Sequence, residues 1–173
     1  IAKRPLTGKA VGWHQDGSYW PLIPMNVLSL WIAGTNSNAN NGCMRIIPGT
    51  QNKKLLNQSD LIKEDMEKFV LGLAIHPDEI DESEAINIEL NPGDISIHNP
   101  FLVHGSNPNK SKEWRIGLTL RYIPTSTFVN RKEWDCILLR GEPSKGINNN
   151  YVKKPVFNSS KHMKFKGFED YLR

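Results

Sequence analysis

The chain contains only two cysteines, Cys43 and Cys136, which lie far apart and in no CxxC spacing. So low a count argues against a fold held together by a disulfide framework. We expect both to be reduced thiols that pack as small apolar side chains in an intracellular protein. A single disulfide between them is the alternative.

Long hydrophobic runs are absent as well. No apolar stretch is long enough to cross a bilayer, and the first residues do not have the shape of a signal peptide. The chain is therefore predicted to be cytoplasmic, with no membrane partner.

A strong excess of charge of one sign is also lacking. The 22 Lys and Arg residues and 18 Asp and Glu residues leave a net charge of +4, too small a surplus to indicate nucleic-acid binding by itself. We interpret the lysines near the C-terminus as a solvated tail, with a polyanion-binding patch as the alternative. These lysines are Lys153, Lys154, Lys161, Lys164 and Lys166.

An initiator methionine is missing from the start of the sequence. The opening stretch "IAKRPLTGKAVG" is typical of a strand or loop already inside a fold, so we expect the chain to be a fragment or a processed piece. Its 173 residues fit one domain with a substantial core. We therefore predict a single domain over residues 1–173.

The apolar residues that are present occur in short runs, rich in β-branched and aromatic side chains and bounded by Gly, Pro and Asn. Such runs are typical of β-strands joined by tight turns. The predicted strands cover residues 25–34, 43–49, 85–90, 93–98 and 114–124. This pattern favours an all-β antiparallel sandwich or barrel over a βαβ fold.

One segment, residues 59–72, has a different periodicity. Its apolar residues recur near one helical face, and Ser59 or Asp60 is a plausible N-cap. The residues on that face are Leu61, Ile62, Met66, Phe69 and Val70. We therefore expect one short helix here, and at most a second in the tail after residue 140.

The stretch "WHQDGSYW" (13–20) places a histidine and an aspartate one residue apart. Residues i and i+2 of a strand point to the same face. If residues 13–17 are extended, His14 and Asp16 can offer an imidazole and a carboxylate to one cation. The alternative is an ordinary surface turn.

A metal site needs a third ligand, and the other histidines differ in their surroundings. His76 lies in an acidic loop and His162 in the basic tail, whereas His98 and His104 flank "NPFLV" directly after a predicted strand. His104 opens "HGSN", where glycine leaves backbone room for a ligand. We therefore favour His104, with His98 as a neighbour of the site or an alternative ligand. Two histidines and one carboxylate suit an Fe(II) that keeps positions open for a cosubstrate and oxygen.

The strand "WRIGLTLRY" contains a candidate partner for an acidic cosubstrate. Arg115 follows His104 closely and shares a strand face with Gly117, Thr119 and Arg121. A guanidinium facing the interior needs a bidentate anionic partner, which a 2-oxo dicarboxylic acid supplies. A surface charge is the alternative interpretation of Arg115.

This ordered set of residues, with "NNGCMRIIPGT" and "PGDISIHNPFLVHGSN" around it, resembles the phytanoyl-CoA dioxygenase family over about residues 12–124. The resemblance implies an Fe(II)- and 2-oxoglutarate-dependent oxygenase that uses O2, on a double-stranded β-helix or jelly roll. It implies His14, Asp16 and His104 as iron ligands. It also implies that Arg115, Ser106 and Trp31 bind 2-oxoglutarate.

The resemblance also bears on the reaction. Related halogenases have a small residue in place of the carboxylate, so Asp16 indicates hydroxylation, with succinate and CO2 as co-products. Family members carry a sizeable segment before the HxD motif that helps to hold 2-oxoglutarate, and we expect this chain to lack it.

The substrate predicted from the sequence is a small polar or anionic molecule. Its candidate contacts are Arg121, Arg45, Trp13 and Tyr19. Aminoalkylphosphonates are one guess for the substrate, and acyl-CoA esters stay open. Two other functions compete with this one, namely a non-catalytic jelly-roll binding module and a dioxygenase that dealkylates nucleic acid.

Overall fold

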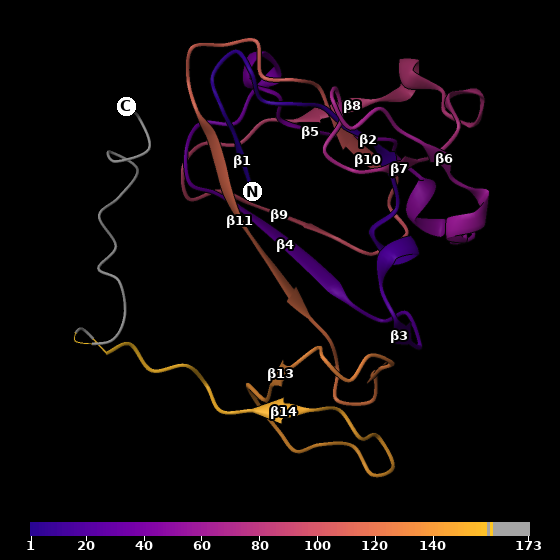
Figure 1. Ribbon diagram of the computed structural model, residues 1–173, viewed down its shortest axis with the longest axis vertical. Helices are drawn as coiled ribbons and strands as arrows, with labels where there is room; N and C mark the ends of the chain where they lie inside the picture. The colour runs from indigo at the N-terminus through magenta and orange to yellow at the C-terminus, as the bar shows by residue number, and fades with distance from the viewer. Residues whose placement is uncertain (159, 161–173) are drawn as a thin grey trace.

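The computed structural model describes residues 1–158 and 160, and two four-stranded sheets form its body (Figure 1). The first sheet has the order β1 (Ala2–Lys3), β11 (Arg115–Tyr122), β4 (Leu28–Ala33) and β9 (Ile95–His98). The second has the order β2 (Val11–His14), β10 (His104–Ser106), β5 (Met44–Ile46) and β8 (Ile86–Ile88). Neighbouring strands in both sheets are antiparallel, as the sequence predicts.

Side chains of the first sheet alternate between a polar inner face and an apolar outer face. In β4, Ser29, Trp31 and Ala33 are buried, whereas the side chains between them are more exposed. The pairing places Ser29 between Arg121 of β11 and His98 of β9. The inner face therefore presents polar and charged groups to the space between the sheets.

The second sheet has its apolar packing on the opposite side. Ile47, Ile75 and Val103 form a buried cluster, against which Trp13 and Leu56 pack among others. The segment between residues 50 and 85 supplies much of this layer. It contains loops and two short strands, β6 (Ile62–Lys63) and β7 (Leu73–Ala74). The cluster supports the second sheet from outside and leaves the inner face of that sheet free for the site.

The helix predicted over residues 59–72 is wrong. The backbone of this segment is used in pairing: β6 pairs with β7, and Val70 N–H donates to the Ala10 carbonyl at 2.9 Å. One helical turn forms where Phe69 N–H donates to the Asp65 carbonyl, and it does not continue. Met66 and Val70 are exposed by 54% and 52%. Pairing with other parts of the chain therefore overrides the local periodicity.

Short 3-10 turns take the place of α-helices throughout the described residues. They cover Asp16–Tyr19, Ala39–Asn41, Thr50–Asn52, Gln58–Asp60, Pro77–Glu79 and Glu82–Glu84. No helix in this part of the chain is long and apolar enough to span a membrane.

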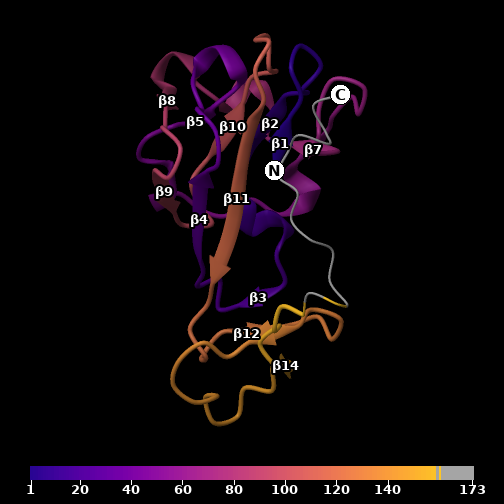
Figure 2. The ribbon, with the colours of Figure 1, turned by 90° about the vertical axis from the view of Figure 1, so that its left-hand side faces the viewer.

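Below the two sheets, the chain after β11 forms a smaller lobe (Figures 1 and 2). Here β3 (Leu22–Ile23) pairs with β12 (Phe128–Val129), and β13 (Cys136–Ile137) pairs in parallel with β14 (Tyr151–Val152). Both cysteines are free, as predicted. Of the basic tail, Lys161, Lys164 and Lys166 lie outside the described residues, as does His162.

Candidate metal centre

His14 and His104 face each other across two neighbouring strands. They are register partners in the pairing of β2 with β10, and their ring centroids are 4.1 Å apart. The Nδ1 of His14 lies 2.8 Å from the Gly12 carbonyl, and the Nδ1 of His104 lies 2.9 Å from the Leu102 carbonyl. If each Nδ1–H donates to its carbonyl, each Nε2 keeps a lone pair for a metal, which is the arrangement that orients ligating histidines.

Asp16 reaches the same place because the backbone turns directly after His14. Gln15 is extended (φ −110°, ψ 125°), and a 3-10 turn begins at Asp16. The buried Gln15 side chain holds the turn from the other side, with its Nε2 donating to the Phe101 carbonyl at 2.8 Å and its Oε1 accepting from Leu56 N–H at 2.9 Å. The i and i+2 geometry predicted for the HxD motif therefore holds, although the strand itself ends at His14.

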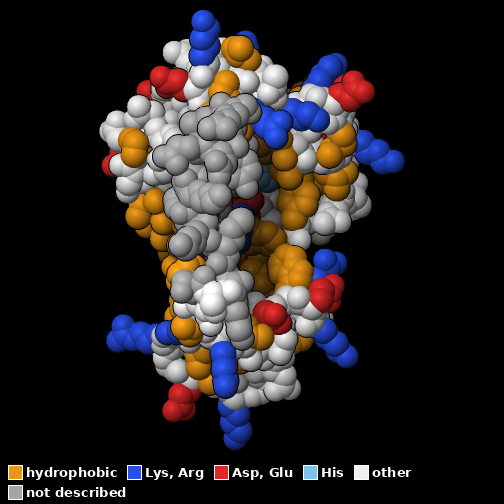
Figure 3. Space-filling view, turned by 60° about the vertical axis from the view of Figure 1, so that its left-hand side comes forward, with side chains coloured by type: hydrophobic (Ala, Val, Ile, Leu, Met, Phe, Trp, Pro, Cys, Tyr) orange, Lys and Arg blue, Asp and Glu red, His pale blue; other side chains and the backbone are white. Residues whose placement is uncertain are grey.

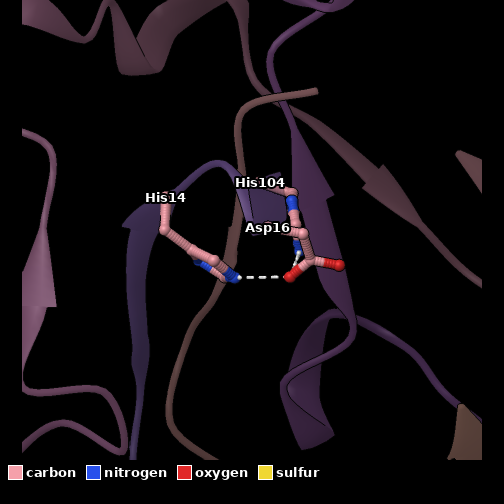
Figure 4. Close-up of side chains that lie close together, drawn as sticks. All are labelled: His14, Asp16 and His104. Atoms are coloured by element: carbon pink, nitrogen blue, oxygen red, sulfur yellow. Dashed lines mark ion pairs between the residues drawn. The ribbon is translucent and has the colours of Figure 1, made fainter. Parts of the chain in front are cut away.

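The three side chains converge on one point (Figure 4). Asp16 Oδ1 lies 3.4 Å from His14 Nε2 and 3.7 Å from His104 Nε2. One donor atom from each residue lies within 4.8 Å of the others, and all three residues are buried. Two imidazole nitrogens and a carboxylate oxygen on one side of a cation match the donor set of an Fe(II) facial triad, so these residues fit the metal.

The protonation states suit metal binding. Burial, reinforced by the neighbouring His14, lowers the pKa of His104 to about 3, so this imidazole is neutral at pH 7. Burial by itself would raise the pKa of Asp16, but His14, His98 and His104 together hold that pKa well below its usual range. The site therefore offers a neutral histidine and an ionised carboxylate without having to lose protons first.

The second carboxylate oxygen of Asp16 lies near three side chains that form a row across the strands of the first sheet. Asp16 Oδ2 lies 3.4 Å from Ser29 Oγ, 3.7 Å from His98 Nε2 and 3.7 Å from an Arg121 guanidinium nitrogen. The three residues are aligned by the register of β11, β4 and β9. His98 therefore lies beside the triad, as expected, and does not join the group whose donor atoms lie within 4.8 Å of one another.

Arg115 is 4% exposed and has no carboxylate partner among the described residues. Its Nε and a terminal nitrogen donate to the Gly42 carbonyl at 3.1 and 2.8 Å, and its guanidinium lies over the Trp31 ring at 5.3 Å. Burial lowers the pKa of Arg115 to about 10, so it stays charged at pH 7. A buried, charged guanidinium whose acceptor within residues 1–158 is a backbone carbonyl is suited to an anionic ligand.

A second buried cation, Lys3, is the register partner of Arg115 in the pairing of β1 with β11. It is 3% exposed, and its Nζ donates to the Asn107 carbonyl at 2.5 Å. Burial and the charge of Arg115 lower the pKa of Lys3 to about 7. Sequence reasoning missed Lys3, because the only signal was a lysine in a segment with strand character.

Polar atoms without partners lie on the inner face between Arg115 and the triad. Ser96 Oγ and Thr119 Oγ1 are buried and find no hydrogen-bond partner in the described part of the chain, and Trp31 lies between these two residues in the strand register. Buried polar groups are normally satisfied. These orphaned hydroxyls therefore fit a polar ligand between the sheets, as 2-oxoglutarate would be.

Gly117 explains how Trp31 fits this face. A Cβ added at Gly117 would overlap the Trp31 ring. Trp31 is 6% exposed and forms the wall beside Arg115. The glycine therefore lets the indole approach β11 closely.

The structure separates the remaining predicted site residues into two groups. Tyr19 lies near the triad, with its ring edge-on to His14 at 6.0 Å, and Ser106 is buried on β10 beside Lys3. Trp13 and Arg45 instead meet each other on the outer side of the second sheet, where Arg45 also contacts the Glu82 carboxylate at 3.0 Å. Alternation along β2 and β5 turns the side chains of Trp13 and Arg45 away from the triad, and their contact with a substrate stays a prediction.

The sequence model of the phytanoyl-CoA dioxygenase (PhyH) family matches residues 1–117. The chain belongs to the phytanoyl-CoA dioxygenase family. Fe(II) and 2-oxoglutarate are typical of this family, and the triad and the double-sheet fold agree with it. The predicted family and the jelly-roll fold are thus confirmed.

Individual relatives show the same likeness. The chain is 27% identical to the peroxisomal phytanoyl-CoA dioxygenase of Mus musculus over 99% of its length. The apo structure of ThoJ, a non-heme monooxygenase, is 25% identical, with a TM-score of 0.71 over 90% of this chain and 54% of that one. EvdO2 from Micromonospora carbonacea var. aurantiaca, complexed with 2-oxoglutarate, is 26% identical, with a TM-score of 0.59 over 70% of this chain and 48% of that one. The chain spans 48% of the mouse protein.

Proposed function

We propose that the protein is an Fe(II)- and 2-oxoglutarate-dependent hydroxylase of a small molecule. The observation that carries the proposal is the convergence of His14, Asp16 and His104, with a charged Arg115 on the neighbouring sheet that has no carboxylate partner among the described residues. The reaction consumes 2-oxoglutarate, O2 and a substrate C–H bond, and gives succinate, CO2 and the hydroxylated product. The domain is proposed to comprise residues 1–173.

Each residue group has a separate task in this proposal. His14, Asp16 and His104 would hold Fe(II), and the metal would supply the oxidising chemistry of the reaction. Arg115 binds the distal carboxylate of 2-oxoglutarate, while Trp31 walls that end of the site and Ser106 lies near it. Ser29, His98 and Arg121 orient the Asp16 carboxylate through its second oxygen.

Asp16 decides between hydroxylation and halogenation. With its carboxylate among the donor atoms, Asp16 would take the coordination position that a halide needs, so we propose hydroxylation. Asp16→Gly is expected to abolish hydroxylation, and product analysis by mass spectrometry tests this. An undiminished rate in the variant would remove Asp16 from the iron.

The proposed location is the cytoplasm. The mouse relative is named as peroxisomal, so cell fractionation of the source organism is the appropriate check. Nucleic acid is not a proposed partner. A salt titration against single-stranded DNA tests this point, because phosphate binding weakens steeply with added salt.

The test of the function is anaerobic and spectroscopic. Fe(II) followed by 2-oxoglutarate should produce the visible metal-to-ligand charge-transfer band of the chelate. His104→Ala should abolish the band. Arg115→Gln should raise the 2-oxoglutarate concentration that gives half of the maximal band intensity by about tenfold or more. Arg131→Gln is the matched control, because Arg131 is an exposed arginine near a carboxylate and a Trp ring.

The result separates the proposal from its rival. A folded protein that binds neither Fe(II) nor 2-oxoglutarate would be the non-catalytic binding module. A chelate that forms equally well in His104→Ala would overturn the assigned ligand set.

A further inference from the structure

A cavity of about 660 Å³ lies between the end of β11 and the lower lobe. Its walls are mainly apolar and include Leu120, Trp134, Cys136, Leu138, Leu139 and Tyr151. Cavities of several hundred Å³ with apolar walls and few polar groups are the usual form of small-molecule sites. Figure 3 shows this face hollowed between the upper body and the lower lobe, with hydrophobic side chains around the hollow.

Arg121 connects the cavity to the metal centre. It lines the cavity, and its guanidinium is also the group that lies 3.7 Å from Asp16 Oδ2. The Trp20 ring lies 4.8 Å from the guanidinium carbon and supports it from one side. A molecule in the cavity that contacts Arg121 would therefore lie next to the triad.

The charges on the cavity wall favour an anion. Its charged side chains are Arg121, Arg140 and Asp135, and Asp135 already accepts from the Asn150 amide. Arg121 is 41% exposed at its side chain and meets Asp16 only at 3.7 Å, so donor capacity remains. A second hollow of about 410 Å³ reaches the site at His98, and its lining among the described residues contains no Lys, Arg, Asp or Glu.

We propose that this cavity binds the substrate, and that the substrate is an apolar small molecule with one anionic group, held by Arg121. The inference rests on the proposed function and narrows its substrate class. The apolar body lies against the segment 134–139, and the anionic group lies at the end of the cavity next to Asp16. The substrate would then be selected in part by a segment that lies outside residues 1–117, the range that the family model matches.

A pair of fluorescent probes tests the inference without metal. Anilinonaphthalene sulfonate has an apolar aromatic body and one anionic group, and phenylnaphthylamine has the same body without the charge. The sulfonate should bind about tenfold or more tightly than the neutral probe, because Arg121 adds a charge-assisted contact. Arg121→Gln should remove that preference and leave the affinity for the neutral probe unchanged, whereas Arg131→Gln should keep the preference.

Filling the cavity locates the probe independently of Arg121. Leu138→Trp should weaken both probes about tenfold or more, while Leu118→Lys on the outer face of the first sheet should not affect either. Binding that survives Leu138→Trp but is lost in Leu118→Lys would overturn the inference, as would equal affinity for both probes. Urea unfolding of each variant confirms that it is folded.

A final measurement separates this inference from the proposed function. In anaerobic protein with Fe(II) and 2-oxoglutarate, the sulfonate probe should shift the chelate band, because Arg121 lines the cavity and also lies 3.7 Å from Asp16 Oδ2. A chelate that forms normally while the probe neither binds nor shifts the band would overturn the cavity assignment alone. Probe binding with full Arg121 dependence in a protein that forms no chelate would support the cavity and overturn the iron chemistry.

Discussion

At the scale of single residues, the site combines groups that proteins rarely bury. Arg115 and Lys3 are adjacent cations in a buried region, and neither has a carboxylate partner among the described residues. Burying like charges together costs stability unless a ligand compensates. The fold therefore keeps an unfavourable arrangement that 2-oxoglutarate would relieve.

Lys3 makes this cost measurable through pH. Its pKa is about 7 in the fold and 10.5 ordinarily, so between these values the unfolded chain binds more protons. Stability should therefore rise with pH above 7, by about 1 kcal/mol per pH unit, until the pH nears 10.5. Urea unfolding at pH 7, 8, 9 and 10 measures this.

Lys3→Met provides the control for the other groups that titrate in this range. The variant should be more stable than the natural chain at pH 7, and the difference should shrink as the pH rises. In the natural chain, saturating 2-oxoglutarate should reduce the rise of stability with pH, because a bound carboxylate keeps Lys3 charged. Parallel stability curves for the two proteins would mean that Lys3 stays protonated throughout.

At the scale of elements, the HxD turn depends on contacts that lie outside its own strand. Gln15→Ala would remove the side chain that pairs with the Phe101 carbonyl and the Leu56 N–H, two partly buried groups. We expect a loss of about 2 kcal/mol in the free energy of unfolding and a decrease of about tenfold in Fe(II) affinity.

Urea unfolding and an anaerobic Fe(II) titration measure the two effects of this substitution. Gln58→Ala, at an exposed glutamine, should change neither quantity. If stability falls while Fe(II) affinity is unchanged, Gln15 supports the fold and does not position Asp16.

The difference between local sequence and contacts with distant parts of the chain explains which elements could be predicted from the sequence. The strand β4 and the strand β11 follow from local composition, because a run rich in β-branched and apolar residues between turns has few other solutions. The predicted helix over residues 59–72 failed because its backbone pairs with Ala10 and with β7, and periodicity does not reveal such partners.

The site residues also differ in whether they could be predicted from the sequence, and the difference has a physical reason. His14 and Asp16 could be predicted because their spacing alone places them on one side of an extended chain. Ser29 and Lys3 could not, because only the register between strands far apart in sequence brings them to Asp16 and Arg115. The outer position of Trp13 and Arg45 could not be predicted either, since an aromatic or a cation beside a motif does not show which face of the sheet it occupies.

At the scale of the whole molecule, the outer face of the first sheet is apolar and exposed. Its side chains alternate with the inner row that holds Trp31 and Ser96. The exposed residues are Leu28 (43%), Ile95 (49%), Ile97 (61%) and Leu118 (57%). Contiguous apolar surfaces of this kind are uncommon on soluble monomers and mark sites of association.

We therefore predict that the 173-residue chain associates with itself through this face as its concentration rises. Replacing Ile97 and Leu118 with Lys should keep the chain monomeric in sedimentation velocity, because like charges would then meet across the interface. The replaced side chains point away from the triad, so Fe(II) and 2-oxoglutarate should still form the chelate. Met66→Lys with Val70→Lys is the matched control, since both residues are exposed to a similar degree on a loop, and it should associate like the natural chain. A natural chain that stays monomeric at all concentrations would show that this face does not mediate self-association.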